Sequence, residues 1–561
     1  SLGIAWGALG RDGNISNPFK SLHDSFYARE ASTKGLGGGF NIKDWFSGEN
    51  AALYGGLEYK LKRYGMRFKL EYDTSNQEIA QLTHGVANLD VSSRFNVGVT
   101  YPIGKWGEIS IGHLRGNQFQ FSVHFKANFN DSGIVPKRAN SRVIPEISKQ
   151  DKEKISNSKK FLYQALTQKL NEERLYMQAA TVSEDTVEVS INQNKYRNYV
   201  RATGRTARVV SSLAPGSIET IAVSFMNPNS TEINKISLNR KEFEKAVKGS
   251  RSTEELLITT KLSSANPSHF ESAEFIPLVI LPDFTWNMGP SLKSHIGGPE
   301  AFFLGQAWWR MDLTVLLARG LTLKTVIGLD IYNNFHQFNN PSSSQIPHVR
   351  SDVQDYLKEG ANNIAQLKLD YIWSPFPEVY TRFDFGLMEE MFGGIGGEIL
   401  YKPFDSDTAI GFFIHRVKQR DYDQRFTFRD YKTTTGFFEL FHELPQDITL
   451  QVLAGKYLAG DKGVTIDVSR RFMSGFRLGI FATKTNLSAQ EFGEGSFDKG
   501  FYFQIPTDLL FQDYRTGNIS FGLHPLTKDG GAILYGSNTL WGLLGNADET
   551  GILRDWRDII D

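Results

Sequence analysis

The chain has 561 residues, enough for two or three domains, and it lacks cysteine, which excludes a disulfide framework and thiol chemistry. Lys plus Arg number 62 and Asp plus Glu also number 62, so the net charge of zero argues against a nucleic-acid partner. No run of about 18 apolar residues occurs, and therefore no transmembrane helix is expected. Aromatic residues (13%) and glycines (52) are abundant, which suits strands joined by close turns.

Residues 1–129 alternate between apolar and polar side chains, the pattern of strands with one face of each kind. Met66, Phe68 and Leu70, for example, alternate with charged residues. The pattern predicts about five or six strands, fewer than the about eight of the smallest closed membrane barrel. We interpret this segment as a partial N-terminal β-barrel, whose other strands are missing or come from another part of the chain.

The next part of the chain changes character twice. Residues 130–160 are polar and charged, contain prolines and lack periodicity, so they predict a linker. Residues 161–263 mix helical and strand patterns and predict a small α/β domain. Helices are expected from about Phe161, from a cap at Asn194 to about Leu213, and from a cap at Asn239; strands are expected at 187–191, 218–225, 233–238 and 256–260.

Strand patterns return in residues 264–548 and predict about twelve to fourteen strands joined mostly by hairpins, the last of them at 533–544. Only a helix or a closed barrel satisfies every backbone group in lipid, so this segment predicts a C-terminal antiparallel barrel. Residues 549–561 form a tail that predicts a short helix. The expected fold class is mainly β: tandem membrane barrels, the first incomplete, with a small α/β domain between them.

The alternation assigns the two faces of the barrel strands. One set of side chains is apolar and is expected to face lipid: Val464, Ile466, Val468, Leu478 and Ile480. The intervening set includes charged residues and is expected to face the lumen: Arg382, Asp384, Asp467, Arg471 and Arg477. A charge on the lipid face costs about 2–4 kcal/mol at mid-bilayer, which supports this assignment.

A basic stripe is expected on the helix of the α/β domain. Its members are spaced four, four and three residues apart, and so share one helix face: Arg197, Arg201, Arg205 and Arg208. The stripe either binds an anionic polymer or partner, or is a solvated face with local ion pairs. Four guanidinium groups are costly to bury without partners, so we expect this face to be open to solvent.

No pattern in the sequence predicts catalytic, cofactor-binding or metal-binding residues. Glu389, Glu390 and Glu398 invite comparison with the paired carboxylates of glycosidases, but adjacent residues on a strand point to opposite faces. The eleven histidines are scattered without a metal-binding spacing. The glycine pairs lack the helix and the Lys-Ser/Thr pair of a phosphate loop. We therefore expect a protein that is not an enzyme.

Several blocks carry a family resemblance: GKYLAGDKG (455–463), SRRF (469–472), EFGEGSFDKGFYFQIP (491–506), IGGEILYKPF (395–404) and NKYRNYVRATGRTARVV (194–210). Collinear across nearly the whole chain, they resemble the YjbH family of outer-membrane exopolysaccharide and capsule proteins. The resemblance implies tandem barrels around a small α/β domain, and a chain that starts inside the N-terminal strands, beyond a signal peptide that is often a lipoprotein one. It supplies no catalytic or binding residue.

Two functions stay open at this point. The first is an outer-membrane protein that takes part in export or assembly of an extracellular or capsular polysaccharide, with its middle domain in the periplasm. Its partners would be the extracellular polysaccharide, outer-membrane lipid and periplasmic polysaccharide-biosynthesis proteins. The second is a surface protein that binds or modifies polysaccharide on a barrel scaffold. Two carboxylates within reach of each other in a cleft would favour a modifying enzyme.

Overall fold

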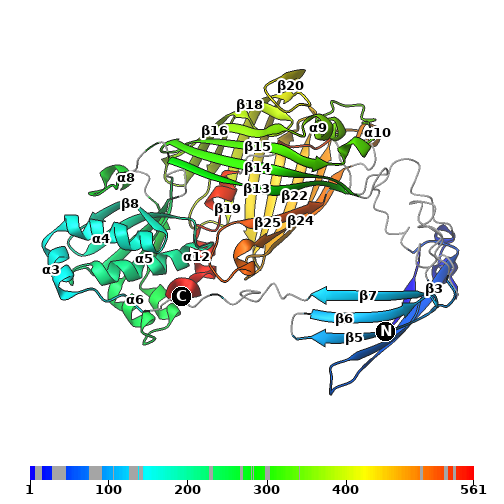
Figure 1. Ribbon diagram of the computed structural model, residues 1–561, viewed down its shortest axis with the longest axis horizontal. Coiled ribbons are helices and arrows are strands. Elements are labelled where there is room, and N and C mark those ends of the chain that lie inside the picture. Colours follow the sequence, from blue (N-terminus) through cyan, green and yellow to red (C-terminus); the bar gives the residue numbers. More distant parts are fainter. Residues whose placement is uncertain are drawn as a thin grey trace. The chain divides into compact units, whose positions relative to one another are not determined.

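A computed structural model describes residues 1–6, 15–27, 46–74, 91–104, 107–125, 137, 143–226, 231–265, 269–278, 281, 283–296, 303–339, 341–492, 497–523, 529–534 and 539–561. The chain divides into two compact units, residues 1–129 and 130–561 (Figure 1). None of the described helices is long and apolar enough to cross a membrane. The fold is mainly β and is built from antiparallel sheets, as predicted.

The first unit is a single antiparallel sheet in the order β1-β3-β4-β5-β6-β7, with β2 paired to β3. Its longer strands are β3 (Asn50–Lys60), β4 (Arg67–Tyr72), β5 (Phe95–Ile103), β6 (Gly107–Leu114) and β7 (Gln118–Phe125); β1 (Leu2–Ala5) and β2 (Ile15–Ser16) are short. Leu57, Leu70 and Val97 face one another across three strands. One face of the sheet is therefore apolar, because the period-two pattern is kept in register from strand to strand.

The α/β part holds a second sheet in the order β12-β11-β10-β9-β8, in which only the β9–β10 pair is parallel among the described strands. Its strands are β8 (Leu175–Val182), β9 (Thr186–Gln193), β10 (Thr220–Met226), β11 (Glu232–Asn239) and β12 (Lys261–Ser264). Its helices are α3 (Lys149–Asn157), α4 (Lys159–Glu172), α5 (Tyr199–Leu213), α6 (Arg240–Val247) and α7 (Thr253–Ile258). The helices pack on the sheet through buried aliphatic and aromatic side chains.

Three details of the α/β part differ from the sequence prediction. Helix α5 begins later than expected, because the amide of Arg201 donates to the side chain of Asn198 and not to Asn194. The predicted strand at 256–260 is wrong, because a reciprocal capping box between Ser252 and Glu255 starts helix α7 there. Helix α3 also occupies the end of the predicted linker. The predicted cap at Asn239 is confirmed.

The largest sheet has thirteen strands, β13 to β25, each antiparallel to its neighbours in sequence. The strands are β13 (Asp283–Ile296), β14 (Phe303–Ala318), β15 (Leu321–Asn333), β16 (Asn363–Phe376), β17 (Val379–Leu387), β18 (Phe392–Tyr401), β19 (Thr408–Arg420), β20 (Phe428–Leu444), β21 (Ile448–Lys456), β22 (Lys462–Arg471), β23 (Arg477–Thr485), β24 (Asp498–Pro506) and β25 (Asn518–Leu523). Figure 1 shows the sheet as strongly curved. Among the described residues no register joins β13 to β25, so closure of the barrel stays a prediction.

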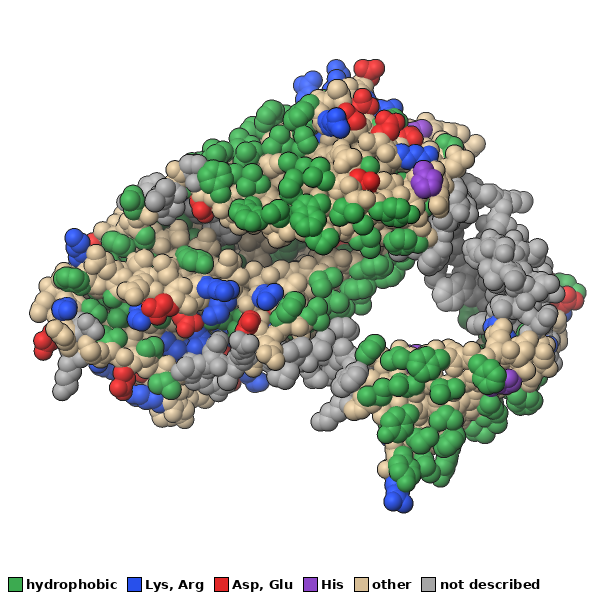
Figure 2. Space-filling model, in the orientation of Figure 1, with side chains coloured by type: hydrophobic (Ala, Val, Ile, Leu, Met, Phe, Trp, Pro, Cys, Tyr) green, Lys and Arg blue, Asp and Glu red, His purple; other side chains and the backbone are tan. Residues whose placement is uncertain are grey.

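The two faces of this sheet have opposite character. Along β22, Val464, Ile466 and Val468 are exposed on the outward face, while Thr465 and Ser469 are buried on the inward face. The same alternation runs through β23, where the predicted lipid-facing residues Leu478 and Ile480 are also exposed. Apolar side chains accordingly cover much of the outer surface of the sheet (Figure 2).

The C-terminal segment, residues 529–534 and 539–561, runs from the inner face of the large sheet to the α/β part. The predicted strand at 533–544 is wrong for all of its described residues: residues 533 and 534 belong to no strand, and Thr539 caps a short helix, α11 (Leu540–Leu544). Residues 535–538 lie outside the described ones. The Trp541 ring stacks on Phe441 of β20 at 4.4 Å between ring centroids. Beyond it, α12 (Glu549–Arg554) and the 3-10 helix η6 (Trp556–Ile560) confirm the predicted helical tail.

Candidate functional site

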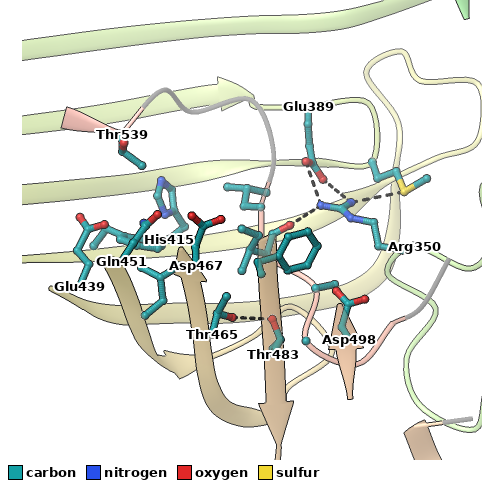
Figure 3. Close-up of a pocket in the computed structure, with 18 of the residues that line it drawn as sticks. Arg350, Glu389, His415, Glu439, Gln451, Thr465, Asp467, Thr483, Asp498 and Thr539 are labelled. Carbon is teal, nitrogen blue, oxygen red and sulfur yellow. Dashed lines mark hydrogen bonds and ion pairs between the residues drawn. The ribbon is translucent and has the colours of Figure 1, made fainter. Parts of the chain in front are cut away.

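The candidate site is a cavity of about 670 Å³ on the inner face of the large sheet (Figure 3). Strands β17 to β24 supply its lining: Arg382, Glu398, Phe413, His415, Glu439, Gln451, Leu453, Thr465, Asp467, Phe481, Thr483 and Asp498. The β17–β18 turn and the loop around Arg350 line it as well, and residues 531–534 and 539 of the C-terminal segment close one side. Its volume lies within the range of about 300–1,000 Å³ typical of small-ligand sites.

An ion-pair network extends across the inner face of β16 to β19. Arg382 on β17 pairs with Glu398, its cross-strand neighbour on β18, at 2.7 Å. Asp384 is fully buried between Arg382 at 3.8 Å and the imidazole of His415 at 3.2 Å. Lys368 on β16 lies 3.9 Å from Asp384. Buried charges of both signs thus neutralise one another at this wall.

Two glycines make room for functional side chains on this wall. A Cβ at Gly396 would overlap the imidazole ring of His415. A Cβ at Gly411 would lie 2.7 Å from a carboxylate oxygen of Glu439, the residue opposite it in the β19–β20 register. Strand glycines here therefore mark positions where a neighbouring side chain crosses the strand.

At the other end of the cavity, a second polar cluster fixes the C-terminal segment. The guanidinium of Arg350 donates to Glu389 at 2.7 and 3.1 Å and to the carbonyl of Ile533 at 2.7 Å. The carboxylate of Asp529 accepts the backbone amides of Arg350 and Ser351 at 2.7 and 2.9 Å. At the end of the cavity that holds the Arg382–Glu398 ion pair, the backbone amide of Leu540 donates to Glu398 at 2.7 Å. Hydrogen bonds at both ends therefore hold the segment against the sheet.

The predicted lumen-facing residues divide into two groups. Arg382 and Asp467 line the cavity, and Asp384 is buried beside it. Arg471 is buried outside the cavity, 3.6 Å from Asp555 of the C-terminal segment, and Arg477 on the neighbouring strand is half-buried. All five lie away from the exposed apolar face.

The expectation for the acidic cluster needs correction. Glu389 and Glu390 were assigned to opposite faces of a strand, but they lie in the turn between β17 and β18. The alternation rule does not hold in a turn, and both residues line the same cavity as Glu398. Each has its own cation: Arg350 for Glu389, Lys293 for Glu390 and Arg382 for Glu398.

The expectation that the basic stripe is open to solvent is wrong. Arg205 and Arg208 are buried, and Arg208 donates to the carbonyls of Gly204 at 3.0 Å and Ile560 at 2.5 Å. Arg197 precedes the helix and lies 3.3 Å from Asp508. Because the C-terminal segment covers α5, the partners of the stripe come from regions distant in sequence.

At Arg201, carboxylates of the C-terminal segment neutralise a positive charge of the basic stripe. Its guanidinium pairs with Asp558 at 3.0 Å and Asp561 at 3.2 Å. Burial raises the pKa of Asp558, and the neighbouring carboxylates of Asp561 and Asp555 add to this effect, while Arg201 opposes it. The stripe is therefore an internal docking surface for the end of the chain.

Sequence reasoning did not single out Arg350, Glu439, Gln451 or Asp498, and it set His415 aside with the other histidines. Glu439 sits between the exposed residues Phe438 and Leu440 on β20, so strand alternation could have found it. Within the described residues, no group of three His, Asp or Glu side chains is arranged to hold a metal ion.

Comparison with known proteins identifies the family. The model of the exopolysaccharide biosynthesis protein family YjbH matches residues 1–546. The chain belongs to the YjbH family. It is similar to a protein of Escherichia coli (strain K12) named an uncharacterized lipoprotein YjbH, with 32% identity over 547 residues. The match covers 95% of this chain and 75% of the E. coli protein.

Membership of the YjbH family links the chain to exopolysaccharide biosynthesis, as the family's name states. The match includes all three sheets, and with them the α/β part and the strands of the cavity. The tail beyond residue 546, which covers the basic stripe, lies outside the matched region of the family model.

Proposed function

We propose that this YjbH-family chain is an outer-membrane β-barrel protein that takes part in export or assembly of an extracellular or capsular polysaccharide. The observation that carries the proposal is the division of the thirteen-stranded sheet into an apolar outer face and a charged inner face. Phe438 on β20 is 69% exposed and Ile480 on β23 is 60% exposed, whereas Asp384 and His415 on the inner face are buried.

A water-soluble protein has the opposite arrangement. Monomers in water rarely expose a continuous apolar patch of more than a few hundred Å². Here the exposed apolar residues recur on successive strands, among them Trp286, Phe385, Ile399, Ile410 and Phe501. Lipid is the environment that such a surface fits, and closure of the sheet would leave no unpaired strand edge in it.

The proposal assigns different surroundings to the other parts. The small first sheet, with its apolar face, belongs to a second barrel that is partial in this chain. The α/β part, which carries mixed surface charge, lies in the periplasm, where polysaccharide-biosynthesis proteins are its partners. The extracellular polysaccharide is the ligand of the inner face, and no catalytic step is assigned to the chain.

The test is conductance and insertion of the full chain. The protein is purified in detergent and added to planar lipid bilayers, with and without the polysaccharide of the producing strain. We expect stepwise conductance that falls when the polysaccharide is present, and a gel mobility that changes on heating because the barrel unfolds. A protein that stays in the aqueous phase and shows no heat-modified mobility would refute the membrane assignment.

One observation favours the second function, binding without conduction. Residues 531–534 and 539 of the C-terminal segment occupy one side of the cavity and are held there by Arg350 and Glu398. A protein that inserts into bilayers, binds the polysaccharide and never conducts would match this alternative.

A further inference from the structure

The lining of the cavity holds more carboxylates than guanidinium groups. Its lining holds six carboxylates (Glu389, Glu390, Glu398, Glu439, Asp467 and Asp498) and two guanidinium groups (Arg350 and Arg382). Both guanidinium groups already pair with carboxylates, Arg350 with Glu389 and Arg382 with Glu398, each at 2.7 Å. A third cation, Lys293, pairs with Glu390. The remaining carboxylates of the lining lie on β20, β22 and β24.

Glu439 on β20 is the most unusual of these carboxylates. It is 1% exposed, and no described residue donates a hydrogen bond to either of its carboxylate oxygens. Its neighbour Glu398 is another carboxyl group and could bind it only by sharing a proton. An ionised carboxylate costs several kcal/mol to bury without a partner. Because Glu439 also lines the cavity, a bound cation could pair with it in place of that shared proton.

The surroundings of Glu439 combine acceptors with aromatic rings. Asp467 accepts a hydrogen bond from the Tyr502 hydroxyl at 3.0 Å and faces Gln451 across the β21–β22 register. Figure 3 shows Glu439, Gln451 and Asp467 toward one end of the cavity, and Arg350 toward the other. Phe413 and Phe481 supply apolar rings to the same lining. A neutral amide such as that of Gln451 can bind the hydroxyl groups of a sugar, and the two aromatic rings can pack against the sugar ring.

We infer that this cavity binds an amino sugar, a hexosamine unit whose free ammonium group pairs with Glu439. An ammonium group carries three protons, and carboxylates such as Glu439 and its neighbour Glu398 accept them in charge-assisted hydrogen bonds. An N-acetylated hexosamine lacks this charge, and a uronic acid would be repelled by the same carboxylates. The inference rests on the proposed function, because it names the kind of polysaccharide unit that the inner face recognises.

The test compares four probes on the full-length protein in detergent by titration calorimetry. The probes are a glucosamine tetramer, an N-acetylglucosamine tetramer, a galacturonate tetramer and spermidine. We expect saturable binding of the glucosamine tetramer, at least tenfold weaker binding of the acetylated tetramer, and no binding of the uronate. Affinity for spermidine equal to that for the glucosamine tetramer would overturn the sugar assignment and leave a polyamine site.

Variants tie the binding to the carboxylate. Glu439→Gln keeps the shape of the side chain, removes its charge and also removes its repulsion with Glu398, so the protein should melt no lower than the wild type while its affinity falls at least tenfold. Asp430→Asn is the matched control, because Asp430 lies on the exposed end of the same strand outside the cavity. Asp467→Asn is a second variant that should weaken binding if Glu439→Gln does not fold.

The outcomes separate this inference from the proposed function. Equal affinity of the amino and acetylated tetramers, or unchanged affinity in Glu439→Gln and Asp467→Asn, would overturn the amino-sugar site. In both cases the bilayer and heat-modifiability experiment would still decide the membrane assignment. Failure of insertion with intact, Glu439-dependent binding would instead refute the barrel and keep the site.

Discussion

Replacing Gly204 with alanine should release the end of the chain from helix α5. A Cβ at this position would lie 2.8 Å from the carbonyl carbon and 3.3 Å from the Cα of Ile559, and closer still to its carbonyl oxygen. These are backbone atoms, so η6 must move as a whole. The helix alone would gain, since alanine is favoured over glycine by about 0.8–1.0 kcal/mol in a helix interior.

The expected loss is larger than this gain. Trp556 and Ile559 of η6 are 3% and 0% exposed, and burial of such a side chain contributes about 1.5–3 kcal/mol. Displacing both would cost about 3–6 kcal/mol, so docking of the tail should weaken by about 2–5 kcal/mol in Gly204→Ala. Each 1.4 kcal/mol is a tenfold change in the docking equilibrium.

Limited trypsin digestion measures this docking, because Arg554 is held in the docked tail with its side chain 18% exposed. We expect cleavage after Arg554 to be at least tenfold faster in Gly204→Ala than in the wild type. Gly216→Ala is the control, since a Cβ there meets nothing within 4 Å. If Gly204→Ala resists trypsin as well as the wild type, the close packing of η6 on α5 is not what holds the tail.

Two further predictions concern the sheet and its loops. Ile466→Arg puts a charge on the exposed apolar face and should destabilise the protein in lipid by about 2–4 kcal/mol, whereas Asp467→Asn should assemble normally. Equal tolerance of both changes in a heat-modified mobility assay would show that the faces are wrongly assigned. For His348, burial opposes ionisation, but hydrogen bonds to the Ser344 carbonyl at 3.1 Å and the Asp352 carboxylate at 2.7 Å outweigh it and raise the pKa. This contribution to stability is present below the ordinary value of 6.5 and is lost as the pH rises through the raised pKa, so His348→Gln should lower the melting temperature more at about pH 5.5 than at about pH 8.5.

Local patterns were enough to predict most of the strands. The alternation of Val464, Ile466 and Val468 with polar residues follows from the two-residue period of a strand, and the structure exposes these three side chains. A helix cap also depends only on neighbouring residues, and the cap predicted at Asn239 is confirmed. The wrong prediction at α7 also has a local cause. The apolar residues of 256–260 fit a strand, but the Ser252–Glu255 capping box just before them starts a helix.

The site itself depends on which distant residues meet. The carboxylate of Glu439 is buried beside Glu398 only because β20 places this side chain on the inner face of the sheet, and Arg208 is buried only because η6 lies over α5. Neither contact has a periodic signal, since 41 and 352 residues separate the partners in sequence. The sequence alone therefore determined the strands, their two faces and the family, because these follow from nearest neighbours and matched blocks. Only the tertiary structure decided which charges share the cavity and which the tail covers, because burial and pairing depend on contacts between elements far apart in the chain.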